Sequence, residues 1–228
     1  MADFEVLRGA SASALRVRLQ GTAAVNAESD ALVSKTHNVE VCASLGSGLG
    51  GLLGGVARSL LTNESFFLQT LQCKGGSGEV LVAPEDQGDI AIVQLPGPNL
   101  SAVLVTSGAF LCAETGIDTS TRVQRASQGL FSGSGFFLMR CSGHGKLAMS
   151  CFGSCVRYDL QPGECREVDN GHLVAWGESV SYSGTLLGIC VFACFVGVIV
   201  IVFLAVLFAS DQPQLEPRRR SRRLSDEF

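Results

Sequence analysis

The chain has few of the residues that bind nucleic acids. Its 228 residues include only three lysines, and 17 basic residues stand against 21 acidic ones. Five arginines and four acids lie from Asp211 onward, so the rest of the chain has 12 basic and 17 acidic residues, a net charge of −5. An acidic surface repels phosphates, and we therefore expect no nucleic-acid partner.

The first residues show no pattern of a leader peptide, and closely paired cysteine motifs are also missing. The first ten residues, MADFEVLRGA, lack the apolar core of a secretory signal and contain acids, which predicts no cleavable leader. Nine cysteines are an odd number, and no CxxC pair occurs. Most lie in apolar runs, such as those around Cys42 and Cys112, where we expect small buried hydrophobes. A reducing compartment fits this usage best.

Long helical periodicity is absent between Phe4 and Ala175. Short apolar runs replace it, rich in valine, isoleucine and phenylalanine, and bounded by glycine, proline, asparagine or aspartate. They cover residues 14–19, 65–71, 78–83, 89–95 and 101–113. The 27 glycines suit many tight turns. The sequence predicts an all-β class.

The strand runs repeat. Residues 25–34, 103–114 and 166–178 each contain a strand, a small or polar corner, and a second apolar strand. A second plan, a phenylalanine-rich strand followed by a glycine turn and a returning strand, occurs at 65–83 and 135–150. We therefore expect a sandwich-like domain made of stacked copies of one β unit that share a core between sheets.

Five segments in this order resemble one protein family. They read LLGGVARSLLTNESFF, LVAPEDQGDI, LFSGSGFFL, DLQPGE and VDNGHLVAW. The chain resembles the altered inheritance of mitochondria protein 24 family over roughly residues 4–182. The resemblance implies a TRAP-like β-sandwich with pseudo-threefold symmetry, a tendency to oligomerise, a link to mitochondrial membranes in eukaryotes, and no established catalytic site. The family continues with a glycine-rich hairpin after residue 188, where this chain becomes uniformly apolar.

That apolar run, from Leu186 to Ala209, contains no charge, proline or amide side chain. A helix rises about 1.5 Å per residue, so the run is long enough to cross a bilayer core of roughly 30 Å. It predicts a single C-terminal transmembrane helix over 183–210, after a β domain over 1–182 and before a tail over 211–228. The bilayer is then a partner, with a mitochondrial membrane favoured. The anchor residues would be Leu186, Phe192, Phe195, Ile199, Phe203 and Leu207.

Residues beside the run could contact the membrane surface. Trp176 and Tyr182 precede it, where aromatic rings often lie at a lipid interface; ordinary core packing is the alternative. The tail contains an arginine cluster, which would bind anionic lipid or serve only as a topology signal. Its members are Arg218, Arg219, Arg220, Arg222 and Arg223. Ser225 follows in a sequence that resembles a basophilic kinase site.

Two patterns resemble enzyme motifs. Gly46, Gly48 and Gly51 have GxGxxG spacing, but the hairpin pattern after them is not the βαβ unit that a dinucleotide site requires. The loop over 46–61 is instead expected to be flexible and could touch a membrane or a neighbouring subunit.

Cysteines and a histidine between residues 141 and 172 suggest other chemistry. Cys141, His144, Cys151 and Cys155 resemble zinc ligands, yet along a hairpin Cys141 and Cys151 would be over about 10 Å apart. A nucleophile pair such as Cys165 with His172 would also need an oxyanion hole, for which the sequence gives no sign.

We therefore expect a non-enzymatic, membrane-anchored scaffold or accessory subunit without metal or cofactor. Its partners would be other subunits of a membrane assembly or further copies of itself. The alternative is a small-molecule-binding protein or thiol-dependent enzyme that uses residues 141–165.

Overall fold

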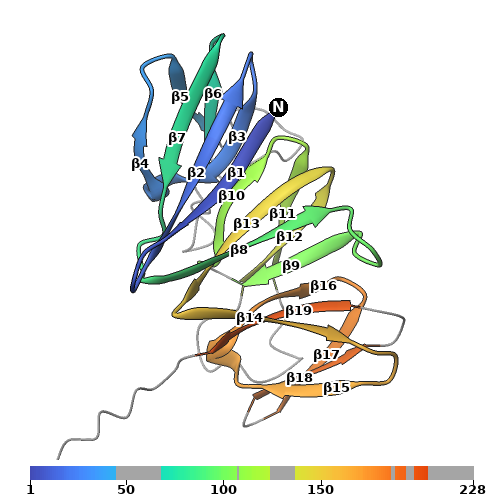
Figure 1. Ribbon diagram of the computed structural model, residues 1–228. Coiled ribbons are helices and arrows are strands. Elements are labelled where there is room, and N and C mark those ends of the chain that lie inside the picture. Colours follow the sequence, from blue (N-terminus) through green and yellow to red (C-terminus); the bar gives the residue numbers. More distant parts are fainter. Residues whose placement is uncertain (45–67, 107, 124–136, 186–187, 194–197, 205–228) are drawn as a thin grey trace, which may run out of the picture.

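The computed structural model describes residues 1–44, 68–106, 108–123, 137–185, 188–193 and 198–204. They form strands β1 to β19 and two short 3₁₀ helices, η1 (Ser29–Ala31) and η3 (Asn170–His172). The all-β prediction is confirmed. Figure 1 shows the strands as a series of sheets, from the N-terminal blue end of the body to the orange and red end.

The strands fall into three consecutive units. The first unit contains β1 (Ala2–Arg8), β2 (Ser13–Gln20), β3 (Ala24–Glu28), β4 (Leu32–Lys35), β5 (Val39–Ser44), β6 (Leu68–Cys73) and β7 (Ser77–Val82). The second unit contains β8 (Gly88–Leu95), β9 (Ala102–Thr106), β10 (Phe110–Glu114), β11 (Ile117–Val123), β12 (Phe137–Gly143) and β13 (Gly145–Phe152). The third unit contains β14 (Ser154–Leu160), β15 (Cys165–Val168), β16 (Leu173–Gly177), β17 (Val180–Thr185), β18 (Gly188–Ala193) and β19 (Val198–Leu204).

Each unit has the same pairing pattern. One half-sheet is β2-β7-β4 in the first unit, β8-β13-β10 in the second and β14-β19-β16 in the third. The other half-sheet is β5-β6-β3, β11-β12-β9 and β17-β18-β15 in the same order. The segments that repeat in the sequence therefore occupy matching places, which supports the prediction of copies of one β unit.

Two antiparallel junctions join the units. At the first junction β3 pairs with β10, and Ala27 lies opposite Cys112. At the second junction β9 pairs with β16, and Val105 lies opposite Ala175. Each junction fuses half-sheets from neighbouring units into one sheet of six strands. The units are thus joined through continuous backbone ladders as well as through side-chain contacts.

A register irregularity recurs at the same place in all three units. The pairing shifts between Leu32 and Ser34 in β4, between Phe110 and Cys112 in β10, and between Leu173 and Ala175 in β16. One extra residue in a ladder bends the strand and increases its twist. The shared irregularity makes Val33, Leu111 and Val174 equivalent positions.

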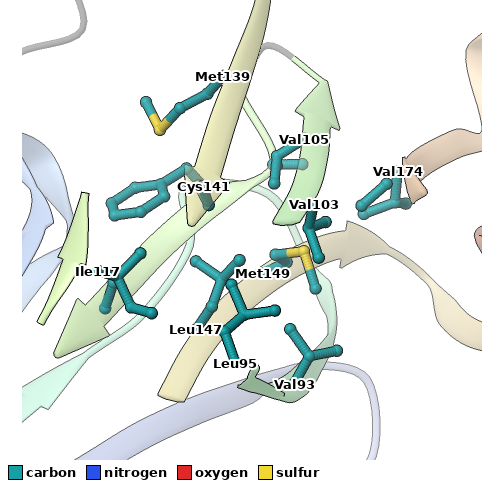
Figure 2. Close-up of a cluster of buried hydrophobic side chains, with 14 of the residues drawn as sticks. Val93, Leu95, Val103, Val105, Ile117, Met139, Cys141, Leu147, Met149 and Val174 are labelled. Atoms are coloured by element: carbon teal, nitrogen blue, oxygen red, sulfur yellow. The ribbon is translucent and has the colours of Figure 1, made fainter. Parts of the chain in front are cut away.

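Three hydrophobic clusters form the described core. Figure 2 shows the cluster of the second unit, where Leu95, Leu147 and Met149 lie near Val103 and Val105 of the other half-sheet. In the first unit, Leu15, Val17 and Leu19 alternate along β2 with outward-facing arginines, as expected from the alternating sequence. Burying these side chains fixes the register, because a slip of one residue would turn the arginines inward.

The predicted transmembrane helix is wrong. Residues 188–193 and 198–204 are strands β18 and β19, and β19 lies between β14 and β16. The β-sheets therefore extend to Leu204, past the predicted boundary at residue 182. A strand in the middle of a sheet often has a continuous apolar sequence, and its many valines and isoleucines favour strand over helix. No helix among the described residues is long and apolar enough to cross a membrane.

Candidate functional site

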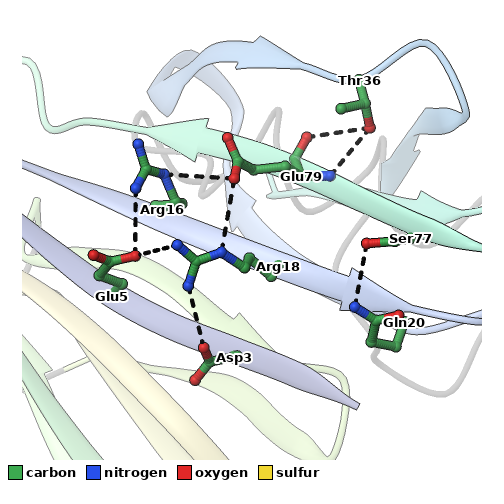
Figure 3. Close-up of polar contacts among 8 residues, drawn as sticks. All are labelled: Asp3, Glu5, Arg16, Arg18, Gln20, Thr36, Ser77 and Glu79. Atoms are coloured by element: carbon green, nitrogen blue, oxygen red, sulfur yellow. Dashed lines mark hydrogen bonds and ion pairs between the residues drawn. The ribbon is translucent and has the colours of Figure 1, made fainter.

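A network of charged side chains covers the outer face of the first sheet (Figure 3). Arg16 and Arg18 on β2 lie between Asp3 and Glu5 on β1 and Glu79 on β7. The shortest contact joins Arg18 Nη2 to Glu5 Oε2 at 2.6 Å. The network brings charges from three strands together on one surface.

The other contacts in this network are longer. Arg16 approaches Glu5 at 3.4 Å and Glu79 at 3.5 Å, and Arg18 approaches Asp3 at 3.5 Å. Lys146 of the second unit adds a contact of 3.6 Å to Asp3. Three cations thus face three carboxylates on a surface open to water. Exposed pairs of this kind contribute little stability, about 0–1 kcal/mol each, and the network is a mutually neutralised surface.

A second polar cluster lies where strands of the first and second units meet. The Asp89 carboxylate at the start of β8 accepts hydrogen bonds from the Ser13 hydroxyl at 3.1 Å and from the Ile90 amide at 2.8 Å. Arg8 at the end of β1 lies 3.3 Å from the same oxygen. This carboxylate therefore ties the β1–β2 hairpin to the second unit.

The thiol groups whose side chains the structure describes do not gather into one site. Cys151 on β13 and Cys155 on β14 form a disulfide, and Cys141 is buried in the core of the second unit. Cys165 is exposed on edge strand β15. His144 lies at the turn between β12 and β13, where its amide donates to the Gly116 carbonyl. Within the described ranges, no three metal-binding side chains lie close enough together to hold an ion.

Burial makes the core thiols poor nucleophiles. Desolvation raises the pKa of Cys141 to about 12, against which the Arg140 charge has a smaller lowering effect. Burial also raises the pKa of Cys112 well above its ordinary value. Because the thiolate is the reactive species, both thiols remain protonated and unreactive at neutral pH. Cys112 is buried as predicted, whereas Cys42 is exposed on edge strand β5 and that prediction was wrong.

Cys165 and His172 belong to different elements of the third unit. Cys165 begins β15, and His172 ends η3 with its Nδ1 3.5 Å from Asp169 Oδ2. Asp169 also accepts the backbone amide of His172. These contacts place His172 at the corner before β16.

Trp176 lies in the core of the third unit. Only 1% of its surface is exposed, and its ring meets that of Tyr182 edge to face with centroids 5.1 Å apart. Its indole N–H finds no acceptor in the part of the chain that the structure describes. Trp176 belongs to a buried cluster that also contains Leu104 and Leu138 of the second unit, a position that corresponds to core packing and not to a ring at a lipid interface.

The same region contains a bidentate ion pair between the second and third units. Arg140 on β12 donates from Nε and Nη2 to the two carboxylate oxygens of Glu178, at 2.8 and 2.7 Å. This hydrogen-bonded pair raises the pKa of Arg140, so the guanidinium stays charged. Sequence analysis missed the pair, because nothing in the two segments indicates that β12 and the end of β16 lie on the same sheet.

Several predicted site residues lie outside the described residues. They are Gly46, Gly48 and Gly51 of the glycine-rich loop, Leu186, Phe195 and Leu207 of the predicted anchor, the arginine cluster, and Ser225. The other three predicted anchor residues are strand residues. Phe192 pairs with Cys165 and Ser181, Ile199 pairs with Asp159, and Phe203 pairs with Cys155.

Comparison with known proteins gives consistent matches over most of the chain. Residues 4–203 match the profile of a family described as mitochondrial biogenesis AIM24. An uncharacterized protein of Streptococcus pyogenes, M6_Spy0233, is 30% identical over 183 residues, which cover 78% of this chain and 72% of the relative. The crystal structure of S. pyogenes protein SPYM3_0169 has a TM-score of 0.71 and 24% identity, covering 90% of this chain and 94% of the other. That structural likeness shows a shared fold.

Proposed function

The chain belongs to the AIM24 family, and from that premise and its architecture we propose that it is a non-catalytic scaffold or accessory subunit of a larger assembly. The family match extends to residue 203, within β19, so the third unit follows the family pattern and does not depart from it as the sequence suggested. Membership in this family does not by itself identify a reaction or a ligand. The proposal therefore depends on how the units are joined and on what their surfaces offer.

The observation that carries the proposal is the repeated sheet junction. One antiparallel edge contact joins the first unit to the second, and the same contact joins the second unit to the third. Backbone pairing of this kind produces a continuous framework with little dependence on particular side chains. A framework built in this way can hold other chains at its remaining edges.

The surface charges support the same proposal. The largest described charge network pairs its arginines with its own carboxylates, so none of its charges is held apart for a substrate. Catalytic sites instead keep acids and bases at perturbed pKa values beside a cleft. A self-neutralised face is suited to close contact with another protein surface, because the contact would bury no unpaired charge of this network.

We also propose that the assembly lies at an organelle membrane. The arginine cluster would supply the contact, because each arginine near anionic lipid contributes about 1 kcal/mol at low ionic strength. A phosphate on Ser225 would add about two negative charges and weaken that contact. Tail peptides with and without the phosphate, titrated with anionic vesicles at two salt concentrations, test this part. Equal binding by both peptides would overturn this part of the proposal.

The alternative is a thiol-dependent enzyme that uses residues 141–165. Its candidate nucleophiles are a buried thiol with a raised pKa at Cys141, two cysteines joined to each other, and Cys165 on an edge strand. The first two are in unreactive forms, and the scaffold proposal expects the same ordinary reactivity from Cys165 as from any exposed thiol.

Two measurements on the full chain separate these functions. The first is the rate at which each cysteine is alkylated at neutral pH, with Cys42 as an internal exposed control. We expect Cys165 to react at the rate of Cys42, and Cys112 and Cys141 to react only on unfolding. The second is the size of the native complex in cell extracts for single Cys141→Ser and Cys165→Ser variants, which we expect to equal that of wild type. Loss of biological activity in either variant at unchanged thermal stability and complex size would overturn the scaffold proposal.

A further inference from the structure

The two junctions inside the chain use the same two strand positions of the repeated unit. The strand before the corner, β3 or β9, pairs with the strand after the corner in the next unit, β10 or β16. A third pair of these strands has no such partner among the described residues. It consists of β4, which pairs only with β7, and β15, which pairs only with β18.

Exposure at these strands supports the comparison. Leu111 and Val174 are 0% and 5% exposed in the junction strands β10 and β16, whereas the equivalent Val33 in β4 is 59% exposed. On β15, Arg166 and Glu167 are exposed, whereas the matching residues of β9, Val103 and Leu104, are buried. The same positions are therefore covered where a neighbouring unit exists and open where none does.

The other edge strands have no counterpart that pairs across a junction between units. Strands β5, β11 and β17 are edges in all three units. Strands β8 and β14 are edges as well, and their counterpart β2 pairs with β1, a strand of its own unit that the other two units do not repeat. Among the described strands, only β4 and β15 are edges whose counterparts pair with a strand of a neighbouring unit. This difference indicates which two edges correspond to an unfilled junction.

The internal register predicts how these edges would meet. In the first junction Ala27, Asn26 and Val25 lie opposite Cys112, Ala113 and Glu114. In β15 the counterparts of Ala27, Asn26 and Val25 are Val168, Glu167 and Arg166. In the first unit the counterparts of Cys112, Ala113 and Glu114 are Ser34, Lys35 and Thr36. The same register therefore sets Val168 opposite Ser34 and Glu167 opposite Lys35.

The facing of Glu167 and Lys35 gives this pairing a chemical preference. Opposite charges on directly facing residues of an antiparallel pair stabilise it, and like charges destabilise it. A charge on an edge strand also discourages pairing with unrelated sheets. Lys35 and Glu167 would thus disfavour most edges and favour one another.

We infer that β15 of one copy of this chain pairs with β4 of a second copy, in the register of the internal junctions. This inference rests on the scaffold function proposed above. Figure 1 places β4 and β15 at opposite ends of the body, so the partner strand comes from another molecule. The contact is head-to-tail, so a pair of copies keeps one free β4 and one free β15. Repetition gives rings if the rotation closes and open strings if it does not.

Charge reversal of the purified full chain tests this pairing. Wild type should associate with rising concentration in analytical ultracentrifugation. Lys35→Glu or Glu167→Lys alone should weaken association roughly tenfold, because each sets like charges opposite one another. A mixture of the two variants should associate as wild type does, since every junction between unlike copies has one positive and one negative residue. Circular dichroism confirms that each variant is folded.

Matched controls exclude a general effect of charge. Asp118→Lys makes the same charge change as Glu167→Lys, but on β11, whose counterparts are edges in every unit. Lys74→Glu makes the same charge change as Lys35→Glu. Both control variants should associate as wild type does. A wild-type monomer at all concentrations, or association that neither reversal weakens, would overturn the pairing. If the purified chain is monomeric but a large native complex persists in cell extracts, the pairing fails and the scaffold function stands. If that complex is also missing, both fail.

Discussion

Trp176 shows how a single residue can report on the packing of a whole unit. It is the only tryptophan in the chain, and its ring is buried against Tyr182 between the second and third units. The sequence placed it near a predicted membrane segment and so suggested a lipid interface. That context was misleading because the neighbouring apolar run forms strands of the same core.

The fluorescence of this residue gives a direct prediction. Because the indole is dry, its emission maximum should be blue-shifted and poorly quenched by acrylamide in the folded protein. Anionic vesicles should leave the spectrum unchanged. Trp176→Phe, which keeps an aromatic ring, serves to confirm that the signal comes from this site. A red-shifted emission that moves to the blue when vesicles are added would contradict the core position.

The buried thiols predict how stability depends on pH. The pKa of Cys141 is about 12 in the folded protein against an ordinary value of 9.0. Between these values the unfolded chain loses its proton while the folded chain keeps it, so stability falls as pH rises. One thiol contributes a slope of about 1.4 kcal/mol per pH unit in that window, and full stability is present below pH 9.0.

Urea unfolding at several values between about pH 8 and about pH 10.5 measures this slope. Cys141→Ala should make the loss of stability with pH shallower, although it lowers stability at neutral pH by leaving a small cavity. Cys42→Ala removes an exposed thiol and should leave the slope unchanged. Parallel curves for wild type and Cys141→Ala would show that this thiol ionises equally in both states.

At the scale of elements, the short strands with alternating or bounded apolar runs were predictable, and the final strands were not. Residues 14–19 alternate between core and solvent, and that pattern indicates a strand on its own. Residues 188–204 are apolar throughout, and such a run fits a buried strand and a membrane helix equally well by hydrophobicity alone. Only pairing with β14 and β16, which are distant in sequence, decides between them.

Substitution of a β19 residue by proline tests whether this segment is a central strand or a membrane helix. Val200 lies opposite both Tyr158 and Trp176, so its strand is paired on both sides. Val200→Pro removes an amide donor from the middle of a sheet and should lower the free energy of unfolding by about 3 kcal/mol or more. Val200→Ile keeps the amide and the β-branch and should change stability much less. Thermal unfolding gives both values, and equal melting temperatures for the two variants would count against a central strand.

At the scale of the whole molecule, the sequence indicated copies of one β unit but not how they meet. The corner segments at 25–34, 103–114 and 166–178 repeat visibly because each must turn at the same place. The junctions between units leave little trace, since Ala27 with Cys112 and Val105 with Ala175 share only small or apolar character. Backbone ladders carry these contacts, and many side chains are compatible with them.

The way the six-stranded sheets are shared has a consequence for complementation between fragments. No unit holds a complete six-stranded sheet, because each such sheet takes one half from one unit and one half from the next. A chain divided between β7 and β8, after Asp86, would leave half of one sheet on each piece. Fragments 1–86 and 87–228 should therefore aggregate or be degraded when expressed alone, and should recover a folded heterodimer when co-expressed, as judged by co-purification through a tag on one piece. Independent folding of both fragments would mean that each unit is stable without the sheet it shares.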